Sequence, residues 1–432
     1  MKDRMGLRIA AAAACVLTGV SAGAETGAPI IDVEKSADRR IAIGIGSYPE
    51  LGSIPPSSTP REVLAFDFAL SVWFAPVVPE EPPSAMIPDW SRAGAEVFVE
   101  FAALAGDVVG RVRDASSGAL LFERAGFVSG EVTRQDLHAF ADDAVTALTG
   151  EPGMAGTQIL CEWDPADGKG KRIVRMDADG HGMQEVTGEE ALELSPRWAP
   201  DGGRCAYTSY SSGWPDVWIQ DLDTGSRERV AHFEGLNAQG DFSPDGGRLV
   251  LTISRDGNPE IHGMDLETGK VRRLTRHRAT DNSPVWSPDG GRIAFVSDRS
   301  GGPQVYVLDL ETREVRRVTF RGSYNTSPDW SPDGRKIAYS SFRSGGFEVR
   351  VVDLATRRVE TVASGGDCED PSWSPDGRSL LYSRSAGRVG ERTELVITHL
   401  KERRTIRISR GVGRFLAPDW SPLLRRTEEE GR

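Results

Sequence analysis

The stretch NSPVWSPDGGRIAFVSDRSGGPQVYVLDLETREVRRVT, residues Asn282 to Thr319, recurs in variant form on both sides of itself. Its motif, an aromatic residue followed by Ser-Pro-Asp-Gly or a close variant, begins at Trp198, Phe242, Trp286, Trp330 and Trp373, with a truncated copy at Trp420. Successive copies lie 44, 44, 44, 43 and 47 residues apart. A repeat of this period indicates either propeller blades or the units of a solenoid.

The strand content of one repeat decides between these two architectures. A short run ends at the aromatic residue, and three more apolar segments follow at Arg292–Val296, Gln304–Leu308 and Val315–Thr319. Four short strands separated by turn residues make one antiparallel blade. Pro-Asp-Gly supplies the first turn, because proline presets φ and glycine accepts a positive φ at no steric cost. The repeat therefore predicts a β-propeller.

The two ends of the repeat region complement each other. Residues Thr157–Val186 match the second, third and fourth strands of a blade, whereas Leu416–Pro422 match a first strand alone. We expect these segments to form a sixth blade, so that the C-terminal strand closes the ring and removes the exposed sheet edges. The predicted fold class is an α/β N-terminal domain followed by an all-β six-bladed propeller closed by its C-terminal strand.

The first 24 residues have the pattern of a secretory signal peptide. Basic residues precede an apolar run from Ile9 to Val20, and small residues follow at Ala22–Ala24. A lipoprotein modified at Cys15 is the alternative. We place a small α/β domain at residues 25–150, the propeller at 151–425 and a charged C-terminal tail at 426–432. Secretion and the absence of a later membrane-length apolar run predict a soluble mature chain without membrane insertion.

The predicted N-terminal domain alternates strands with helices. Arg39–Gly46 has the pattern of a strand, and Thr59 with Glu62 forms a capping box before a helix that we expect to reach Trp73. Three strands follow from Glu96, Asp107 and Gly118, and a second capping box at Thr133 opens a helix ending at Gly150. The proline-rich segment between Phe74 and Pro88 is expected to lack regular structure.

Composition and cysteine usage exclude some classes of partner and scaffold. The formal net charge of −12 argues against nucleic acid as a partner. Cys161, Cys205 and Cys368 remain after signal removal, without metal-type spacing. A single disulfide among the three is left open.

Motifs for catalysis are missing from the sequence. A propeller-containing peptidase needs a hydrolase domain with a Gly-x-Ser-x-Gly elbow, and that pentapeptide does not occur. A metal-dependent lactonase needs channel ligands that typically include histidine, and all six histidines lie outside the predicted first strands. Gly44-Ile-Gly46 lacks the third glycine of a dinucleotide fingerprint. We expect no enzymatic activity and no cofactor.

The variable loops are the candidate binding surface, because the Pro-Asp-Gly turns belong to the repeated scaffold and lie on the opposite face of the blades. Polar, tyrosine and arginine side chains in these loops suit protein binding. Solvation alone is the competing explanation for their polarity. The candidate partner-binding residues are Asn237, Arg276, His277, Arg278, Asp281, Asn282, Arg299, Tyr324, Asn325, Thr326 and Arg343.

The residue preceding each motif aromatic shows a second pattern. Aspartate occupies alternate blades, at Asp241, Asp329 and Asp419, whereas the intervening positions hold Arg197, Val285 and Ser372. If the three carboxylates lean into the central channel, they surround one axis and offer a site for a cation such as calcium. Chance and lateral salt bridges are the alternatives, and no metal is assigned.

The order of these elements resembles the TolB family, the periplasmic propeller proteins of the Tol-Pal system of Gram-negative bacteria. The resemblance rests on the signal peptide, on AGAEVFVEF (Ala93–Phe101) and ADDAVTALTGEPGMAGTQI (Ala141–Ile159), on the motif repeats and on the terminal Trp-Ser-Pro strand. It implies a monomer whose propeller binds the peptidoglycan-associated lipoprotein Pal, with Asn282 and Asn325 most favoured for contact.

The resemblance also implies that the N-terminal segment binds the inner-membrane protein TolA, through Pro29, Ile30, Ile31, Asp32, Val33 and Glu34. The assembly would support outer-membrane integrity and constriction in cell division. A propeller that binds or processes a small molecule or a saccharide is the alternative function.

Overall fold

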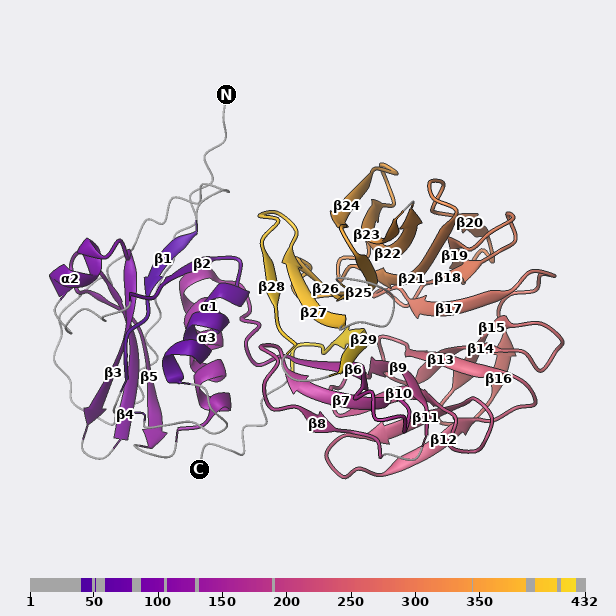
Figure 1. Cartoon of the computed structure of the whole chain (residues 1–432), viewed down its shortest axis with the longest axis horizontal. Coiled ribbons are helices and arrows are strands. Elements are labelled where there is room, and N and C mark those ends of the chain that lie inside the picture. Colours follow the sequence, from indigo (N-terminus) through magenta and orange to yellow (C-terminus); the bar gives the residue numbers. More distant parts are fainter. Residues whose placement is uncertain are drawn as a thin grey trace. The chain divides into compact units, whose positions relative to one another are not determined.

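The repeats build a ring of four-stranded antiparallel sheets, preceded by a separate α/β unit (Figure 1). The computed structural model describes residues 40–48, 51, 59–79, 87–104, 107–128, 132–188, 191–343, 345–385, 393–409 and 413–424. These residues fall into two compact units that divide between Gly156 and Thr157. The predicted signal peptide, Pro29–Glu34 and the tail at 426–432 lie outside the described residues. Within those ranges, no helix has both the length and the apolar character needed to cross a membrane.

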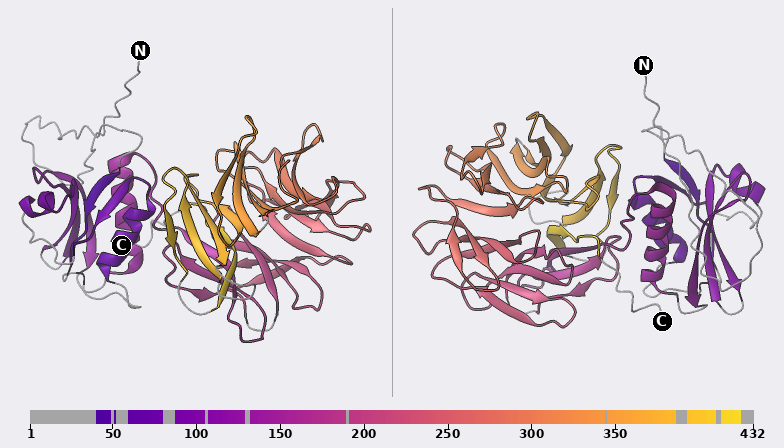
Figure 2. Two further views of the ribbon diagram at one scale, coloured as in Figure 1. Left: turned by 45° about the horizontal axis from the view of Figure 1, so that its top comes forward. Right: turned by 180° about the vertical axis from the view of Figure 1, so that it is seen from behind.

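The N-terminal unit is a five-stranded mixed sheet of order β2-β1-β3-β4-β5. Strand β1 runs parallel to β2 and β3, and the β3-β4-β5 pairs are antiparallel. Helices α1 and α3 pack together on one face of the sheet (Figures 1 and 2). The elements are β1 (Ile41–Gly44), α1 (Pro60–Leu70), β2 (Phe74–Val77), α2 (Ile87–Arg92), β3 (Val97–Leu104), β4 (Asp107–Asp114), β5 (Leu120–Val128) and α3 (Arg134–Thr149).

Local sequence explains both long helices of this unit. Thr59 and Thr133 accept hydrogen bonds from the backbone N–H three residues ahead, and the acidic residues there return a bond, which confirms both predicted capping boxes. Helix α1 ends at Leu70 rather than at Trp73. The prediction of an irregular segment after Phe74 is wrong at its start, since β2 pairs in parallel with β1 there.

A buried histidine–aspartate hydrogen bond and a tight glycine contact organise the interior of the same unit. The Nδ1 atom of His138 on α3 lies 2.9 Å from both carboxylate oxygens of Asp67 on α1, so the pair joins the two helices. A Cβ atom at Gly44 would lie 2.3 Å from Cε3 of Trp90. Close packing against Trp90 therefore explains why residue 44 is a glycine. In the sequence, Gly44 belongs to the incomplete dinucleotide fingerprint Gly44-Ile-Gly46.

The propeller consists of six blades, and the sixth combines the two ends of the repeat region. The first five blades are β9 (Glu193–Trp198), β10 (Arg204–Ser209), β11 (Asp216–Asp221) and β12 (Arg227–Ala231); β13 (Asn237–Phe242), β14 (Arg248–Ile253), β15 (Glu260–Asp265) and β16 (Val271–Arg273); β17 (Asp281–Trp286), β18 (Arg292–Ser297), β19 (Gln304–Asp309) and β20 (Val315–Arg317); β21 (Tyr324–Trp330), β22 (Lys336–Arg343), β23 (Gly346–Asp353) and β24 (Val359–Ala363); and β25 (Asp367–Trp373), β26 (Ser379–Ser385), β27 (Thr393–His399) and β28 (Thr405–Arg407). The sixth is β29 (Arg414–Trp420), β6 (Gln158–Asp164), β7 (Arg172–Asp177) and β8 (Gln184–Glu185).

The C-terminal strand closes the ring as predicted. Strand β29 pairs antiparallel with β6, with Phe415 opposite Trp163 and Trp420 opposite Ile159. The indole Nε1 of Trp420 donates to the hydroxyl of Thr157 over 2.9 Å, and Ser421 N donates to the carbonyl of Gln158 over 2.9 Å. Trp420 is buried. Residues more than 250 positions apart in the chain thus form a single sheet.

Motif aromatics fill the interfaces between blades. Trp286 and Trp330 are buried. Arg248 and Arg292 each begin the second strand of the preceding blade. Their guanidinium groups lie 4.9 Å and 4.8 Å from the ring centroids of Trp286 and Trp330, respectively. Such cation–π contacts add to the apolar area that each aromatic buries. Cys161, Cys205 and Cys368 are buried and free, so no disulfide joins them.

Candidate functional site

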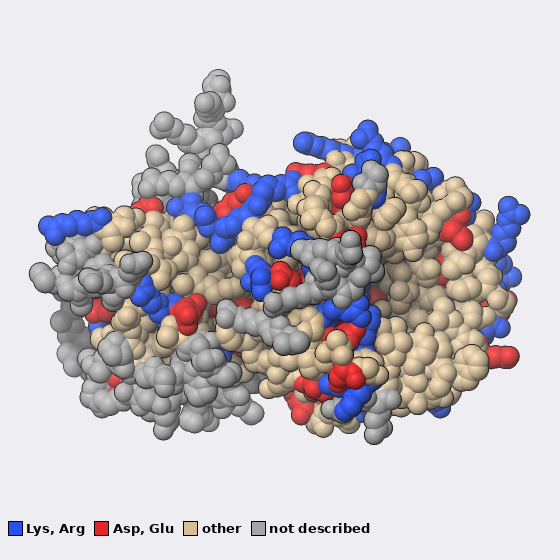
Figure 3. Space-filling view, viewed as in Figure 1, with Lys and Arg blue, Asp and Glu red and all other residues tan. Residues whose placement is uncertain are grey.

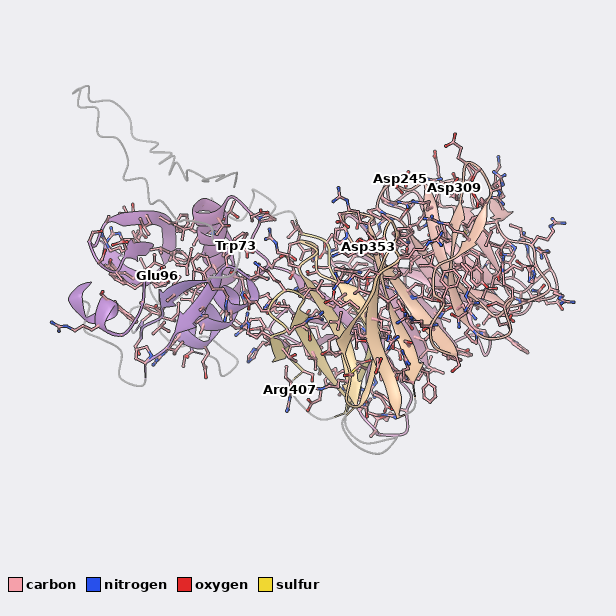
Figure 4. All side chains as sticks on the ribbon, turned by 90° about the horizontal axis from the view of Figure 1, so that it is seen from above. Trp73, Glu96, Asp245, Asp309, Asp353 and Arg407 are labelled. Carbon is pink, nitrogen blue, oxygen red and sulfur yellow. The ribbon has the colours of Figure 1, made fainter. Side chains whose placement is uncertain are left out.

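Chain connectivity gives the propeller two chemically different faces. In each of the first five blades, the Pro-Asp-Gly turn joins the first and second strands, and it lies on the same face as the turns between third and fourth strands, here the turn face. The connections between second and third strands, and between successive blades, lie on the other, here the loop face. In Figure 4, the turn residues Asp245, Asp309 and Asp353 lie along one edge of the propeller, and Arg407 at the end of β28 lies toward the other.

Side chains of the turn face are engaged by their own backbone. The carboxylate of Asp309 accepts hydrogen bonds from Thr312 N and Thr312 Oγ1, and Asp353 bonds Thr356 in the same way. These bonds lower the pKa of both carboxyl groups. The turn face therefore repeats turns whose aspartates are satisfied locally, whereas the loop face and the channel differ from blade to blade.

Three predicted binding residues are fully buried and hold loops in place. Nδ2 of Asn237 donates to Phe233 O over 2.7 Å, and Nδ2 of Asn325 donates to Arg321 O over 3.0 Å. Asp281 accepts two hydrogen bonds from Nη2 of Arg299, at 2.9 and 2.7 Å. These buried side chains position the loop face rather than meeting a partner.

Four other predicted residues present their side chains to solvent. Arg276, Arg278, Tyr324 and Arg343 are exposed, and Tyr324 retains 44% of its accessible surface. His277, Asn282 and Thr326 are half-buried. Arg299 packs its guanidinium 5.0 Å from the ring centroid of Tyr306, in addition to its bonds with Asp281.

A buried glutamate holds the loop that carries the exposed pair Arg276 and Arg278. Glu260 accepts hydrogen bonds from Thr275 Oγ1 at 2.6 Å, from Arg273 Nη2 at 2.7 Å and from His277 N at 2.7 Å. These bonds lower the pKa of the carboxyl group, although burial alone would raise it. A fixed loop presents its arginines at a lower entropic cost of binding than a loose one.

Exposed aromatics of the loop face were missed by the sequence analysis. Trp214 keeps 71% of its surface accessible, Phe320 keeps 62% and Phe342 keeps 43%. Trp214 and Phe320 lie in loops, and Phe342 is the last residue but one of β22. Their positions at or beyond the strand ends were the signal available in the sequence. Figure 3 shows acidic and basic side chains interspersed over the visible face of the propeller.

The first strands line the central channel, and each contains one residue with left-handed backbone. These residues stand three positions before the motif aromatic and have φ between 43° and 55°: Ser195, Gln239, Ser283, Ser327, Asp370 and Ala417. They lie beside shifts in strand register and line a cavity together with the prolines that follow most of them. Non-glycine residues adopt this conformation at a cost that the surrounding structure must offset.

The three alternating aspartates surround a cation that the chain itself supplies. Nη1 of Arg197 lies 2.9 Å from Oδ1 of Asp419 and 4.0 Å from Oδ1 of Asp329. Asp241 also acts electrostatically on this guanidinium. Burial lowers the pKa of Arg197, but the three carboxylates outweigh it and raise the pKa above its ordinary value.

The same carboxylates join neighbouring blades. The second oxygens of Asp241, Asp329 and Asp419 accept hydrogen bonds from the backbone N–H groups of Trp286, Trp373 and Trp198, over 2.7 to 2.8 Å. Ser372 plays the corresponding role toward Trp420 N, over 3.0 Å. The alternation of aspartate in the sequence therefore reflects contacts between blades and one internal ion-pair cluster.

Channel burial makes the stability of the propeller depend on pH. Burial raises the pKa of Asp329 to about 7 and that of Asp241 to about 6, against the lowering effect of Arg197. Between the unfolded value of 3.8 and these folded values, the folded state binds more protons than the unfolded state. Their ionisation therefore lowers the free energy of unfolding as pH rises from 5.5 to 8.

We expect Asp329→Asn, which keeps an acceptor for Trp373 N, to reduce this loss of stability between pH 5.5 and 8. The melting temperature, followed by circular dichroism, should fall less in the variant than in the parent, by a few degrees. Burial lowers the pKa of His262, and this shift raises stability as pH rises, opposite to the effect of the aspartates. The variant is therefore compared with the parent, which shares this contribution. Asp309→Asn on the turn face is the control, and identical pH profiles for Asp329→Asn and the parent would contradict the assignment.

The geometry defines a closed six-bladed propeller with a repeated turn face, a chain-specific loop face, and an α/β unit before it in the sequence. Residues 145–424 match the family model for the TolB beta propeller domain, and the chain belongs to this family. The crystal structure of TolB from Acinetobacter baumannii matches with a TM-score of 0.76 and 31% identity, over 89% of this chain and 97% of that one.

Curated relatives carry the same description. The Tol-Pal system protein TolB of Chromobacterium violaceum is 36% identical over 241 residues, 51% of this chain and 53% of the relative. The protein of that name from Nitrosococcus oceani is 33% identical over 248 residues, 54% of this chain and 57% of the relative. The matched regions thus span little more than half the length of these relatives.

Proposed function

We propose that this chain is a non-catalytic, periplasmic protein-binding scaffold of the Tol-Pal system. In this role the loop face of the propeller binds a Pal-like outer-membrane lipoprotein, and the N-terminal segment at Pro29–Glu34 binds a TolA-like inner-membrane protein. The assembly supports outer-membrane integrity and constriction during division. Family membership supports the role, and the predicted signal peptide supports the compartment.

The observation that carries the proposal is the asymmetry between the two faces. The turn face repeats one set of self-satisfied turns, whereas the loop face presents exposed arginines and exposed aromatics, with the described loops at His277 and Arg321 held by buried side chains. Exposed aromatic and arginine residues on a rigid support are the usual anchors of protein interfaces. The channel is occupied by an internal ion-pair cluster, which favours binding across its mouth over chemistry inside it.

Titration of the mature chain with the soluble domain of a Pal-like lipoprotein from the same organism tests the proposal. Isothermal titration calorimetry should show a 1:1 complex with a Kd in the micromolar range or tighter. Absence of binding at about 100 µM of both proteins would overturn the proposed role. A mature chain that lacks Pro29–Glu34 should bind the lipoprotein domain with unchanged affinity, since the proposal assigns this segment to the other partner.

A further inference from the structure

Three aromatic side chains lie side by side on three adjacent strands of the fourth blade, at its loop-face end. Tyr324 on β21 is the cross-strand partner of Phe342 on β22, which in turn is opposite Phe347 on β23. The ring centroids of Tyr324 and Phe347 are 5.9 Å apart, and those of Phe342 and Phe347 are 5.2 Å apart, both in edge-to-face geometry. The three rings therefore form one continuous aromatic surface.

This surface results from an extension of the blade hairpin. Strand β22 ends at Arg343 and has 8 residues, whereas β18 in the preceding blade ends at Ser297 and has 6. Phe342 and Arg343 are the additional residues, and the pairing with β23 continues to Gly346. Tyr324 and Phe342 keep 44% and 43% of their surfaces accessible, although their neighbours Asn325 and Ser341 are fully buried.

Two exposed arginines lie at the same loop-face end of the blade as the aromatic surface. Arg321 and Arg343 are exposed, and neither side chain makes an ion pair or hydrogen bond with any residue that the structure describes. Arg321 lies in the loop that leads into β21, and Arg343 is the last residue of β22, so both belong to the loop-face end of the fourth blade.

Two acidic residues on strands at this end of the blade are hydrogen-bonded within the chain. Glu348 accepts hydrogen bonds from Nε and Nη2 of Arg350, over 2.9 and 2.7 Å. Oδ1 of Asp367 accepts from Phe347 N over 3.0 Å. The chain carries a net charge of −12, yet at this end of the blade the two arginines outnumber Asp367, whose charge the bond from a backbone N–H leaves in place. Charge complementarity thus calls for carboxylates on whatever covers it.

We propose that Arg321, Tyr324, Phe342, Arg343 and Phe347 form the principal contact surface for an acidic, aromatic- or aliphatic-bearing segment of the protein partner. This blade-4 patch deepens the proposed function and rests on it. Apolar side chains of the segment pack on the rings, and its carboxylates pair with the two guanidinium groups. Because the patch is preformed on paired strands, binding orders few additional side chains.

Variants of the mature chain, titrated with the soluble Pal-like domain, test the proposal. Phe342→Ala should weaken binding about 10-fold or more, as expected for a central aromatic anchor. Arg343→Glu should weaken it more than Arg343→Ala, and raised salt should reduce the affinity of the parent more than that of Arg343→Ala. The matched control is Arg358→Glu, an exposed arginine on the turn face of the same blade, which should bind as the parent does. Unchanged melting temperatures exclude loss of folding as the cause.

The outcomes separate this proposal from the proposed function. If the parent binds the lipoprotein domain and all patch variants bind equally well, the blade-4 patch is overturned and the proposed function stands. If the parent does not bind, the proposed function fails and the patch proposal fails with it. Binding of soluble peptidoglycan fragments that is lost in Phe342→Ala, with lipoprotein binding unchanged, would reassign the patch to saccharide and overturn a protein partner there.

Discussion

Ending the chain at Phe415 is expected to unfold the propeller. The truncation removes Leu416 to Trp420 from β29, and with them the inner strand of the sixth blade and its pairing with β6. Loss of the buried Trp420 side chain alone costs about 3–5 kcal/mol. The open ring also exposes unpaired edges, and the total approaches the ~5–15 kcal/mol that stabilises a typical domain.

Circular dichroism and size-exclusion chromatography check this result. The truncated chain should lack the cooperative thermal transition of the parent and should aggregate. A chain that ends at Leu424 is the control, because it keeps β29 and its hydrogen bonds to β6, and its melting temperature should match that of the parent. A truncation at Phe415 that melts cooperatively at the parent temperature would show that the ring does not depend on its C-terminal strand.

Arg197→Met is expected to destabilise the propeller by about 3 kcal/mol, at the lower end of the range for removing one partner of a buried ion pair. The substitution leaves Asp241, Asp329 and Asp419 without their shared counter-ion, and the Arg197 side chain is only 23% exposed. Removal of its attraction raises the pKa values of the three carboxyl groups further. The loss of stability should therefore be larger at pH 8 than at pH 5.5.

Urea unfolding at both pH values measures this effect. The midpoint should fall, while the slope of free energy against urea stays unchanged. Arg358→Met is the control, since this exposed arginine lies on the turn face. A loss below about 0.5 kcal/mol, or one that is equal at both pH values, would contradict an internal counter-ion role for Arg197.

The propeller could be predicted from the sequence because its information is repeated. Trp286 and its counterparts mark the same interface six times, and the unmatched first strand at Leu416 could pair only with the incomplete unit after Thr157. The short strand β2 escaped prediction, because its Phe-Ala-Pro-Val sequence gains its stability from the parallel partner β1, a tertiary contact that local pattern does not encode.

The site was harder to predict, because polarity in a loop does not reveal which way a side chain points. Asn325 and Tyr324 are adjacent and both polar, yet one is fully buried against Arg321 O and the other is exposed. The alternating aspartates suggested an ion in the channel. Arg197 also precedes a motif aromatic, as the three aspartates do. Only the closed propeller brings its guanidinium to Asp419, 222 residues away in the sequence.

Amide hydrogen exchange of the complex with the Pal-like domain tests the central claim, binding through the loop face, most directly. The account predicts slowed exchange on binding in the loops at residues 276–280 and 319–324 and in the hairpin around residues 342–347. It predicts no change in the Pro-Asp-Gly turns, such as residues 288–290. Protection confined to those turns would place the partner on the opposite face and contradict the account.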